Sequence, residues 1–207
     1  IDLGYEWFFT DDAAATVSFF YKDVKTHIGN AETQIEFNGN SYDLNGPING
    51  DGGEIKGLEL LYQQSLTFLP WPFDGLGIYT NYSYVDSNIK EFVPEENPYT
   101  LGGLSKHVGN FTLWYYKDGF DARISTNYRS EYTGISSWKP SEITLNAAET
   151  TIDASIGYEF NEHFKVQLQA QNLTDEAAVN YWDNDKTRPA LYNEWGRRFM
   201  FGFTYSM

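Results

Sequence analysis

The chain has 207 residues, a formal net charge of −15, no cysteine and a mean hydropathy of −0.50, and 18% of its residues are aromatic. The acidic balance argues against nucleic-acid binding, which requires a basic surface, and the lack of cysteine excludes disulfides and thiolate metal sites. No run approaches the roughly 18 apolar residues of a transmembrane helix. A membrane-spanning fold would therefore have to be a closed β-barrel.

Nine segments alternate large apolar residues with small or polar ones, which is the period of a β-strand with one apolar face. The last one, Phe199 to Met207, places an apolar or aromatic residue at every second position. In chain order the predicted strands are residues 3–9, 15–28, 58–62, 76–84, 106–116, 120–129, 152–160, 164–170 and 199–207.

The connections between these segments alternate strictly between short and long. The short turns are residues 10–13, 69–75, 117–119 and 161–163, and the long loops are residues 29–53, 86–104, 133–149 and 174–196. Transmembrane barrels have short periplasmic turns and long extracellular loops. The pattern favours an all-β, antiparallel transmembrane β-barrel over the alternative of a soluble, glycan-binding β-sandwich. Because bacterial single-chain barrels have even strand numbers, nine strands predict that residues 1–207 belong to a larger barrel.

The polar faces of three predicted strands carry charged and amide side chains at alternate positions. An apolar core would not tolerate them unpaired, whereas the lumen of a barrel would. The residues predicted to face the lumen are Asp121, Arg123, Asn127, Arg129, Asp153, Glu159, Gln167 and Gln169.

Several short stretches, in their order and spacing, resemble the C-terminal barrel of TonB-dependent outer-membrane receptors. They are Gly57-Leu58-Glu59, the segment from Leu101 to Asn110, Tyr128-Arg129-Ser130, the segment from Asn172 to Glu176, and Gly196-Arg197-Arg198. The Leu104-Ser105-Lys106-His107 stretch is similar to the oligosaccharide-uptake branch. The terminal Met207 departs from the family, which usually ends in an aromatic residue.

This resemblance implies the last nine strands of a barrel of about 22 strands with a plugged lumen, in the outer membrane of a Gram-negative bacterium. The implied partners are the rest of the barrel, a plug domain without a counterpart in this chain, the TonB complex acting through that plug, and outer-membrane lipid and lipopolysaccharide. The implied function is uptake of a scarce nutrient, an oligosaccharide in first place and a ferric siderophore as the alternative.

Aromatic and planar polar residues in the long loops are candidates for ligand contact, because flat rings and amide or carboxylate groups suit a sugar. The predicted ligand-binding residues are Trp138, Trp182, Asp183, Asn184, Asp185 and Arg188. Aromatic residues near strand ends can instead anchor a barrel in the membrane interface.

No catalytic set is predicted, and no cofactor or metal site. The three histidines, His27, His107 and His163, fall on both expected membrane sides, so that no nucleophile and base converge. The sequence therefore predicts a transporter and not an enzyme.

Overall fold

The computed structural model describes residues 1–90, 101–135 and 143–207. The described residues form thirteen β-strands and one 3-10 turn, η1, at Phe73–Gly75, and none of their helices is long and apolar enough to cross a membrane. The strands are β1 (Asp2–Thr10), β2 (Ala13–Phe37), β3 (Asn40–Ser65), β4 (Leu76–Ser87), β5 (His107–Lys117), β6 (Phe120–Arg129), β7 (Tyr132–Ile135), β8 (Ile143–Asn146), β9 (Glu149–Asn161), β10 (Phe164–Gln171), β11 (Ala177–Trp182), β12 (Pro189–Glu194) and β13 (Arg198–Tyr205).

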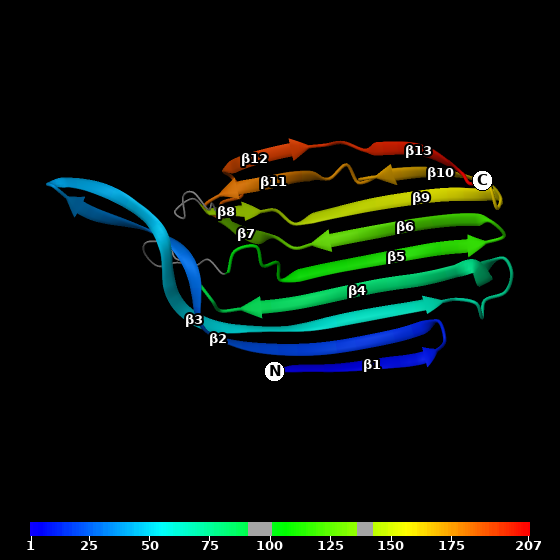
Figure 1. Ribbon diagram of the computed structural model, residues 1–207, viewed down its shortest axis with the longest axis horizontal. Helices are drawn as coiled ribbons and strands as arrows, with labels where there is room; N and C mark the ends of the chain where they lie inside the picture. Colours follow the sequence, from blue (N-terminus) through cyan, green and yellow to red (C-terminus); the bar gives the residue numbers. More distant parts are fainter. Residues whose placement is uncertain (91–100, 136–142) are drawn as a thin grey trace.

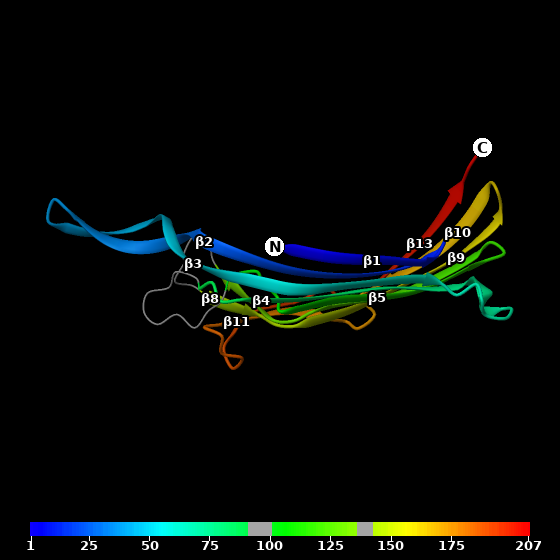
Figure 2. The same cartoon turned by 90° about the horizontal axis from the view of Figure 1, so that it is seen from below.

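Nine of these strands form one antiparallel sheet, in the order β1-β2-β3-β4-β5-β6-β9-β10-β13 (Figure 1). This arrangement confirms the nine strands predicted from the alternation. The other four form a smaller sheet, β12-β11-β8-β7, at one end of the large one. Figure 2 shows that the large sheet is curved like a trough and forms a single layer. Within the described residues β1 and β13 stay at opposite edges, so the sheet is open.

In each of the nine strands the alternating apolar residues lie on the same face of the sheet, because directly paired residues of antiparallel strands share a face. The opposite face is mostly polar, although Trp114 and Leu61 also lie on it. One row runs from Phe201 to Leu168 and Ile156, which are 73%, 47% and 46% exposed. In the described residues the buried hydrophobic side chains are those of Ala13, Ile89, Ile143 and Leu145, and none of these forms a layer against that row. The apolar face is thus the outer surface of a wall, and the β-sandwich alternative is wrong.

The short turns lie together at the end of the sheet opposite the small sheet, as predicted (Figure 1). Asp118 and Gly119 between β5 and β6 have φ of 52° and 79°, the left-handed conformation that a two-residue turn of type I′ requires. The Asp-Gly pair was the signal for this turn.

The prediction of a loop over residues 29–53 is wrong, because β2 and β3 stay paired without a register shift up to the turn at Asn38-Gly39. That turn again has positive φ at both positions, 52° and 77°. The glycine and asparagine content suggested a loop, while the alternation of Ile35 and Phe37 with Gln34 and Glu36 was the signal for a strand. The outer half of this hairpin projects beyond the sheet (Figure 1).

Two other predicted loops contain short strands. Residues 133–149 include most of β7 and all of β8, and residues 174–196 include β11 and β12. These strands are four to six residues long, and β7, β11 and β12 do not alternate apolar with polar residues. Residues 91–100 of the predicted loop 86–104 lie outside the described residues.

Candidate functional site

The polar face of the large sheet collects the eight residues that the sequence predicted for the lumen. Asp121 pairs in register with Gly157, Arg123 with Ser155, and Gln169 with Ser155, so β6, β9 and β10 present one continuous polar surface. The same alternation places the other five on this face: Asn127, Arg129, Asp153, Glu159 and Gln167.

Side chains of this polar face form ion pairs and hydrogen bonds with one another. Lys165 forms an ion pair with Asp121 at 2.9 Å, and Gln169 donates to Gln167 at 3.1 Å. A Cβ at Gly157 would lie 2.4 Å from Oδ2 of Asp121, so the glycine leaves the space that the Asp121 carboxylate occupies. A hollow of 420 Å³ is lined by Asp121, Gln167 and Arg123 together with the rings of Tyr79 and Trp114.

Asp153 and Asn127 support the wall in the same way. Asp153 accepts the backbone N–H of Asn172 at 2.9 Å, and Asn127 accepts a hydrogen bond from the amide of Asn110 at 2.6 Å. Hydrogen bonds within a polar wall satisfy groups that would otherwise be costly to enclose. Each of these interactions accounts for its residue without a bound ligand.

Arg129 ties the wall to the segment before β5. Its Nε donates to Oγ of Ser105 at 2.6 Å, a terminal nitrogen donates to the carbonyl of Gly103 at 2.7 Å, and its guanidinium lies 3.7 Å from the ring centroid of Tyr132. A planar guanidinium suits this combination of stacking and forked hydrogen bonds. Arg129 therefore fixes the position of the first residues of β7.

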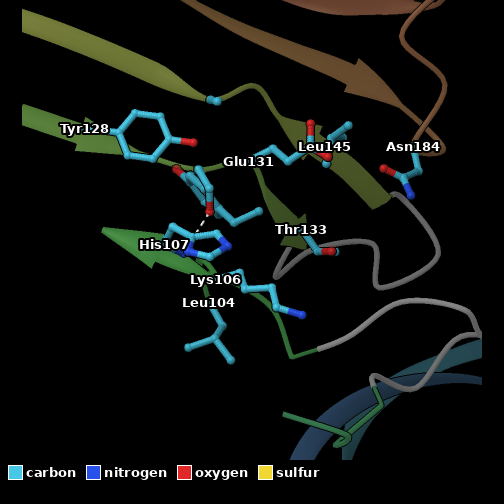
Figure 3. Close-up of a pocket in the computed structure, with 11 residues that line it drawn as sticks. Leu104, Lys106, His107, Tyr128, Glu131, Thr133, Leu145 and Asn184 are labelled. Atoms are coloured by element: carbon cyan, nitrogen blue, oxygen red, sulfur yellow. Dashed lines mark hydrogen bonds between the residues drawn. The ribbon is translucent and has the colours of Figure 1, made fainter. Parts of the chain in front are cut away.

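A second hollow, of 500 Å³, lies where the ends of β5 and β6 meet the small sheet (Figure 3). We call it the outer hollow. Asn184 faces it from the connection between β11 and β12, and Leu145 comes from β8. The residues lining it are Leu104, Lys106, His107, Tyr128, Ser130, Glu131, Tyr132, Thr133, Leu145, Ala148 and Asn184.

The Lys106-His107 pair at the outer hollow is held by neighbouring strands. Lys106 forms an ion pair with Asp86 at 3.2 Å, and this hydrogen-bonded partner raises the pKa of Lys106. Nδ1 of His107 is hydrogen-bonded to the hydroxyl of Tyr82 at 2.7 Å, and the backbone N–H of His107 donates to Oγ of Ser130 at 3.0 Å. These contacts give the Leu104–His107 stretch, on which the likeness to the oligosaccharide branch rested, a structural role.

Glu131 carries the acidic charge at the outer hollow. It forms an ion pair with Lys186 at 2.7 Å, and the pKa of Lys186 is raised by its hydrogen bond to Glu131. This pair joins the end of β6 to the turn after β11. Glu131, which lines the outer hollow, is therefore tied by an ion pair to the connection between β11 and β12.

The predicted ligand-binding residues of 182–188 form the turn between β11 and β12. Asp183 and Arg188 form an ion pair across this turn. Asp185 accepts hydrogen bonds from Oγ1 of Thr187 at 2.7 Å and from its backbone N–H at 2.9 Å, and these bonds lower the pKa of Asp185. Of this group, Asn184 lines the outer hollow.

Of the two tryptophans predicted to bind ligand, the structure describes only Trp182. Trp182 is half-buried, and its backbone N–H donates to the carbonyl of Arg188 at 2.8 Å, which closes the turn. Trp138 lies outside the described residues. Sequence reasoning missed Lys106 and Glu131 as neighbours of Asn184, because the fold of β7 and β8 over the sheet end brings them together. Lys106 lies in the stretch 101–110 that carried the family resemblance, and Glu131 directly follows the stretch Tyr128-Arg129-Ser130.

The three histidines lie far apart in the fold. His27 belongs to the projecting hairpin, His107 begins β5 at the outer hollow, and His163 lies in the turn between β9 and β10 at the opposite end. In the part of the chain that the structure describes, no three His, Cys, Asp or Glu residues are grouped closely enough to hold a metal ion.

The sheet is open and antiparallel, with an exposed apolar face and a polar face whose side chains are hydrogen-bonded or ion-paired. These are the features of a segment of a β-barrel wall. Residues 1–173 match the family model described as TonB dependent receptor-like, beta-barrel. The chain therefore belongs to the TonB-dependent receptor family, as a part of its β-barrel. A search of curated proteins found no match.

Solved structures of similar fold agree with this assignment. The siderophore receptor PiuA from Acinetobacter baumannii is 19% identical with a TM-score of 0.64, over 99% of this chain and 28% of that one. The ferric-catecholate import receptor Fiu from K12 E. coli is 15% identical (TM-score 0.66, 99% and 27%), and the ferric citrate transporter FecA is 17% identical (TM-score 0.65, 98% and 30%). The chain thus spans less than a third of the length of these proteins.

Proposed function

We propose that residues 1–207 are the C-terminal wall of a TonB-dependent transporter in the outer membrane of a Gram-negative bacterium. The observation that carries this proposal is the family match over residues 1–173, together with a sheet whose apolar face is exposed along every strand. In this assignment the apolar face contacts lipid and lipopolysaccharide, and the polar face lines the lumen. The remaining strands complete the barrel, and a plug domain transmits the action of TonB.

The long-loop end of the sheet is then extracellular, following the rule that barrels have short periplasmic turns. The outer hollow lies at this end, where a ligand arrives first. Its lining combines the aromatic ring of Tyr132, which stacks on Arg129 of the polar face, with an amide, a carboxylate and an ammonium group. This combination can bind a ligand that has both rings and oxygen-rich polar groups.

We further propose an iron–chelate complex as the transported ligand. PiuA is a siderophore receptor, Fiu is a ferric-catecholate import receptor and FecA is a ferric citrate transporter, and these ligands support the assignment. The oligosaccharide expectation rested on Leu104–His107, whose polar contacts are accounted for by Asp86, Tyr82 and Arg129. Uptake of an oligosaccharide becomes the second candidate, supported by the aromatic and amide lining of the outer hollow.

The test is growth of a strain that depends on the full-length receptor. Iron-limited medium with ferric catecholate or ferric citrate is compared with medium in which an oligosaccharide is the sole carbon source, each with and without TonB. We expect TonB-dependent growth on an iron chelate. Growth on the oligosaccharide alone would refute the ligand assignment, and uptake that continues without TonB would refute the transporter assignment.

A matched pair of variants locates binding. Asn184→Gly removes an amide from the outer hollow and tolerates the positive φ of 60° there, whereas Asn193→Ala removes an exposed amide from β12 nearby. We expect weaker ligand binding by the first variant and unchanged binding by the second. Equal effects of the two would show that the outer hollow is not the site of capture.

A further inference from the structure

The outer half of the β2–β3 hairpin, residues 26–51, is a two-stranded ribbon with which no third strand of the described residues pairs. Pairing of β1 with β2 ends at Phe20, and pairing of β4 with β3 ends at Ile55. Twelve residue pairs, from Thr26↔Asp51 to Phe37↔Asn40, continue beyond the sheet (Figure 1). A two-stranded ribbon is marginally stable in water by itself and gains stability from a third strand or a packing surface.

One face of this ribbon is apolar. The register places Ile35 opposite Tyr42, with Leu44 and Ile48 two and six residues further along β3 on the same face. Together with Phe37 at the turn, these side chains are between 39% and 62% exposed. The other face presents Gln34, Glu36, Ser41, Asp43 and Asn45. An exposed apolar stripe backed by a polar face is typical of an interaction surface.

The ribbon is also acidic. Residues 26–51 contain Glu32, Glu36, Asp43 and Asp51 and no lysine or arginine. A two-stranded ribbon is thin, so carboxylates on its polar face interact electrostatically with a partner bound to the ribbon. The distance is within the Debye length, about 8 Å at physiological salt. The charge repels a second copy of the ribbon and an anionic lipopolysaccharide surface, and it attracts a cationic partner.

The size of the face decides what kind of partner fits. At about 3.3 Å per residue, twelve pairs make a ribbon about 40 Å long and about 10 Å wide, or about 400 Å² per face. A stable interface between folded proteins buries about 800 Å² on each partner. A short extended segment needs less apolar area, because main-chain hydrogen bonds along a strand edge contribute to its binding.

The β2 edge is suited to such a segment. Residues 26–37 of β2 contain no proline, whereas the facing part of β3 contains Pro47, which cannot donate a hydrogen bond. We propose that the ribbon binds an extended cationic polypeptide segment with alternating apolar residues, which adds as a third strand along β2 and continues the apolar face with its own apolar side chains. This inference concerns the hairpin alone and does not depend on the ligand that the barrel transports.

The test uses the full-length receptor in a neutral detergent and a fluorescent ten-residue peptide of alternating lysine and valine. Fluorescence anisotropy should show saturable binding that weakens as salt is raised. Ile35→Ser removes a side chain from the apolar face of β2, and Ile28→Ser removes one of equal size from the opposite face of the same strand, where Ile28 is 76% exposed. We expect the affinity to fall about tenfold for Ile35→Ser and to stay unchanged for Ile28→Ser.

Two control peptides separate pattern from charge. A peptide of alternating glutamate and valine, and a peptide with five lysines followed by five valines, should both bind at least about tenfold more weakly. In the wild-type receptor, the lysine–valine peptide should slow hydrogen exchange of residues 26–37, a readout that requires no variant. Absence of saturable binding, equal losses for the two serine variants, or equal binding of the block peptide would each overturn the proposal.

Discussion

Replacement of Leu168 by arginine tests which face of the sheet contacts lipid. Leu168 lies between Phe201 and Ile156 on the apolar face and is 47% exposed. If Phe164 at the start of β10 marks the interface, Leu168 is four residues further, about 13 Å along the strand and about 10 Å in depth for a tilt of about 40°. Half of an apolar band about 25 Å tall is about 12 Å, so Leu168 lies near the midplane.

Arginine at the midplane costs about 2–4 kcal/mol, which lowers the folding equilibrium constant about 30- to 700-fold. The control is Gln167→Arg, one residue away on the polar face. Gln167 pairs with Gly202, beside which there is open space for a longer side chain, and it shares a hollow with the Asp121 carboxylate. We expect this control to cost little.

The assay is the folded fraction of the full-length receptor in lipid vesicles, measured by heat-modifiable migration across a urea series. Wild type, Leu168→Arg and Gln167→Arg are compared at the same lipid composition. Equal loss of folded barrel in the two variants, or a larger loss for Gln167→Arg, would show that the assignment of the two faces is wrong.

Three further predictions concern the outer end of the sheet. Asn184→Gly, which keeps the positive φ of 60° at this position, should weaken ligand binding several-fold without lowering the melting temperature of the receptor. Both are measured by titration and thermal unfolding of the same sample, and a lowered melting temperature with unchanged affinity would contradict the prediction. Arg129→Lys should lose the forked hydrogen bonds and the stacking on Tyr132, at a cost of about 1–2 kcal/mol, seen as faster proteolysis of the 101–106 segment; an unchanged rate would argue against this role. Hydrogen bonds from Thr187 lower the pKa of Asp185, so they stabilise the turn when Asp185 is ionised. This stabilisation should be fully present above the ordinary aspartate pKa of about 4, and it should be lost as the pH falls through the pKa of Asp185 in the folded protein. Hydrogen exchange of residues 182–188, corrected for the intrinsic rate at each pH, should show this loss in the wild type and not in Asp185→Asn.

The sequence by itself determined the large sheet. Alternation over eight or more residues, as in β6, β9 and β13, assigns both the strand and its two faces, because a slip of one residue would move every side chain to the wrong face. The Asp118-Gly119 turn was also predictable from the sequence, since a tight hairpin requires residues that tolerate positive φ. The contrast between short and long connections was predictable as well. The predicted polar positions followed from the same period.

Only the tertiary structure decided how the outer end is built. The strands β7, β11 and β12 do not alternate apolar with polar residues, and the pairing of β8 with β11 joins residues far apart in the sequence. The neighbours of Asn184 at the outer hollow therefore depend on how the small sheet folds over the end of β5 and β6. The hairpin over residues 26–51 shows the converse case. Its alternation was present in the sequence, but its glycines and asparagines obscured it, and the unbroken β2–β3 register revealed an apolar face that the linear sequence had hidden in a presumed loop.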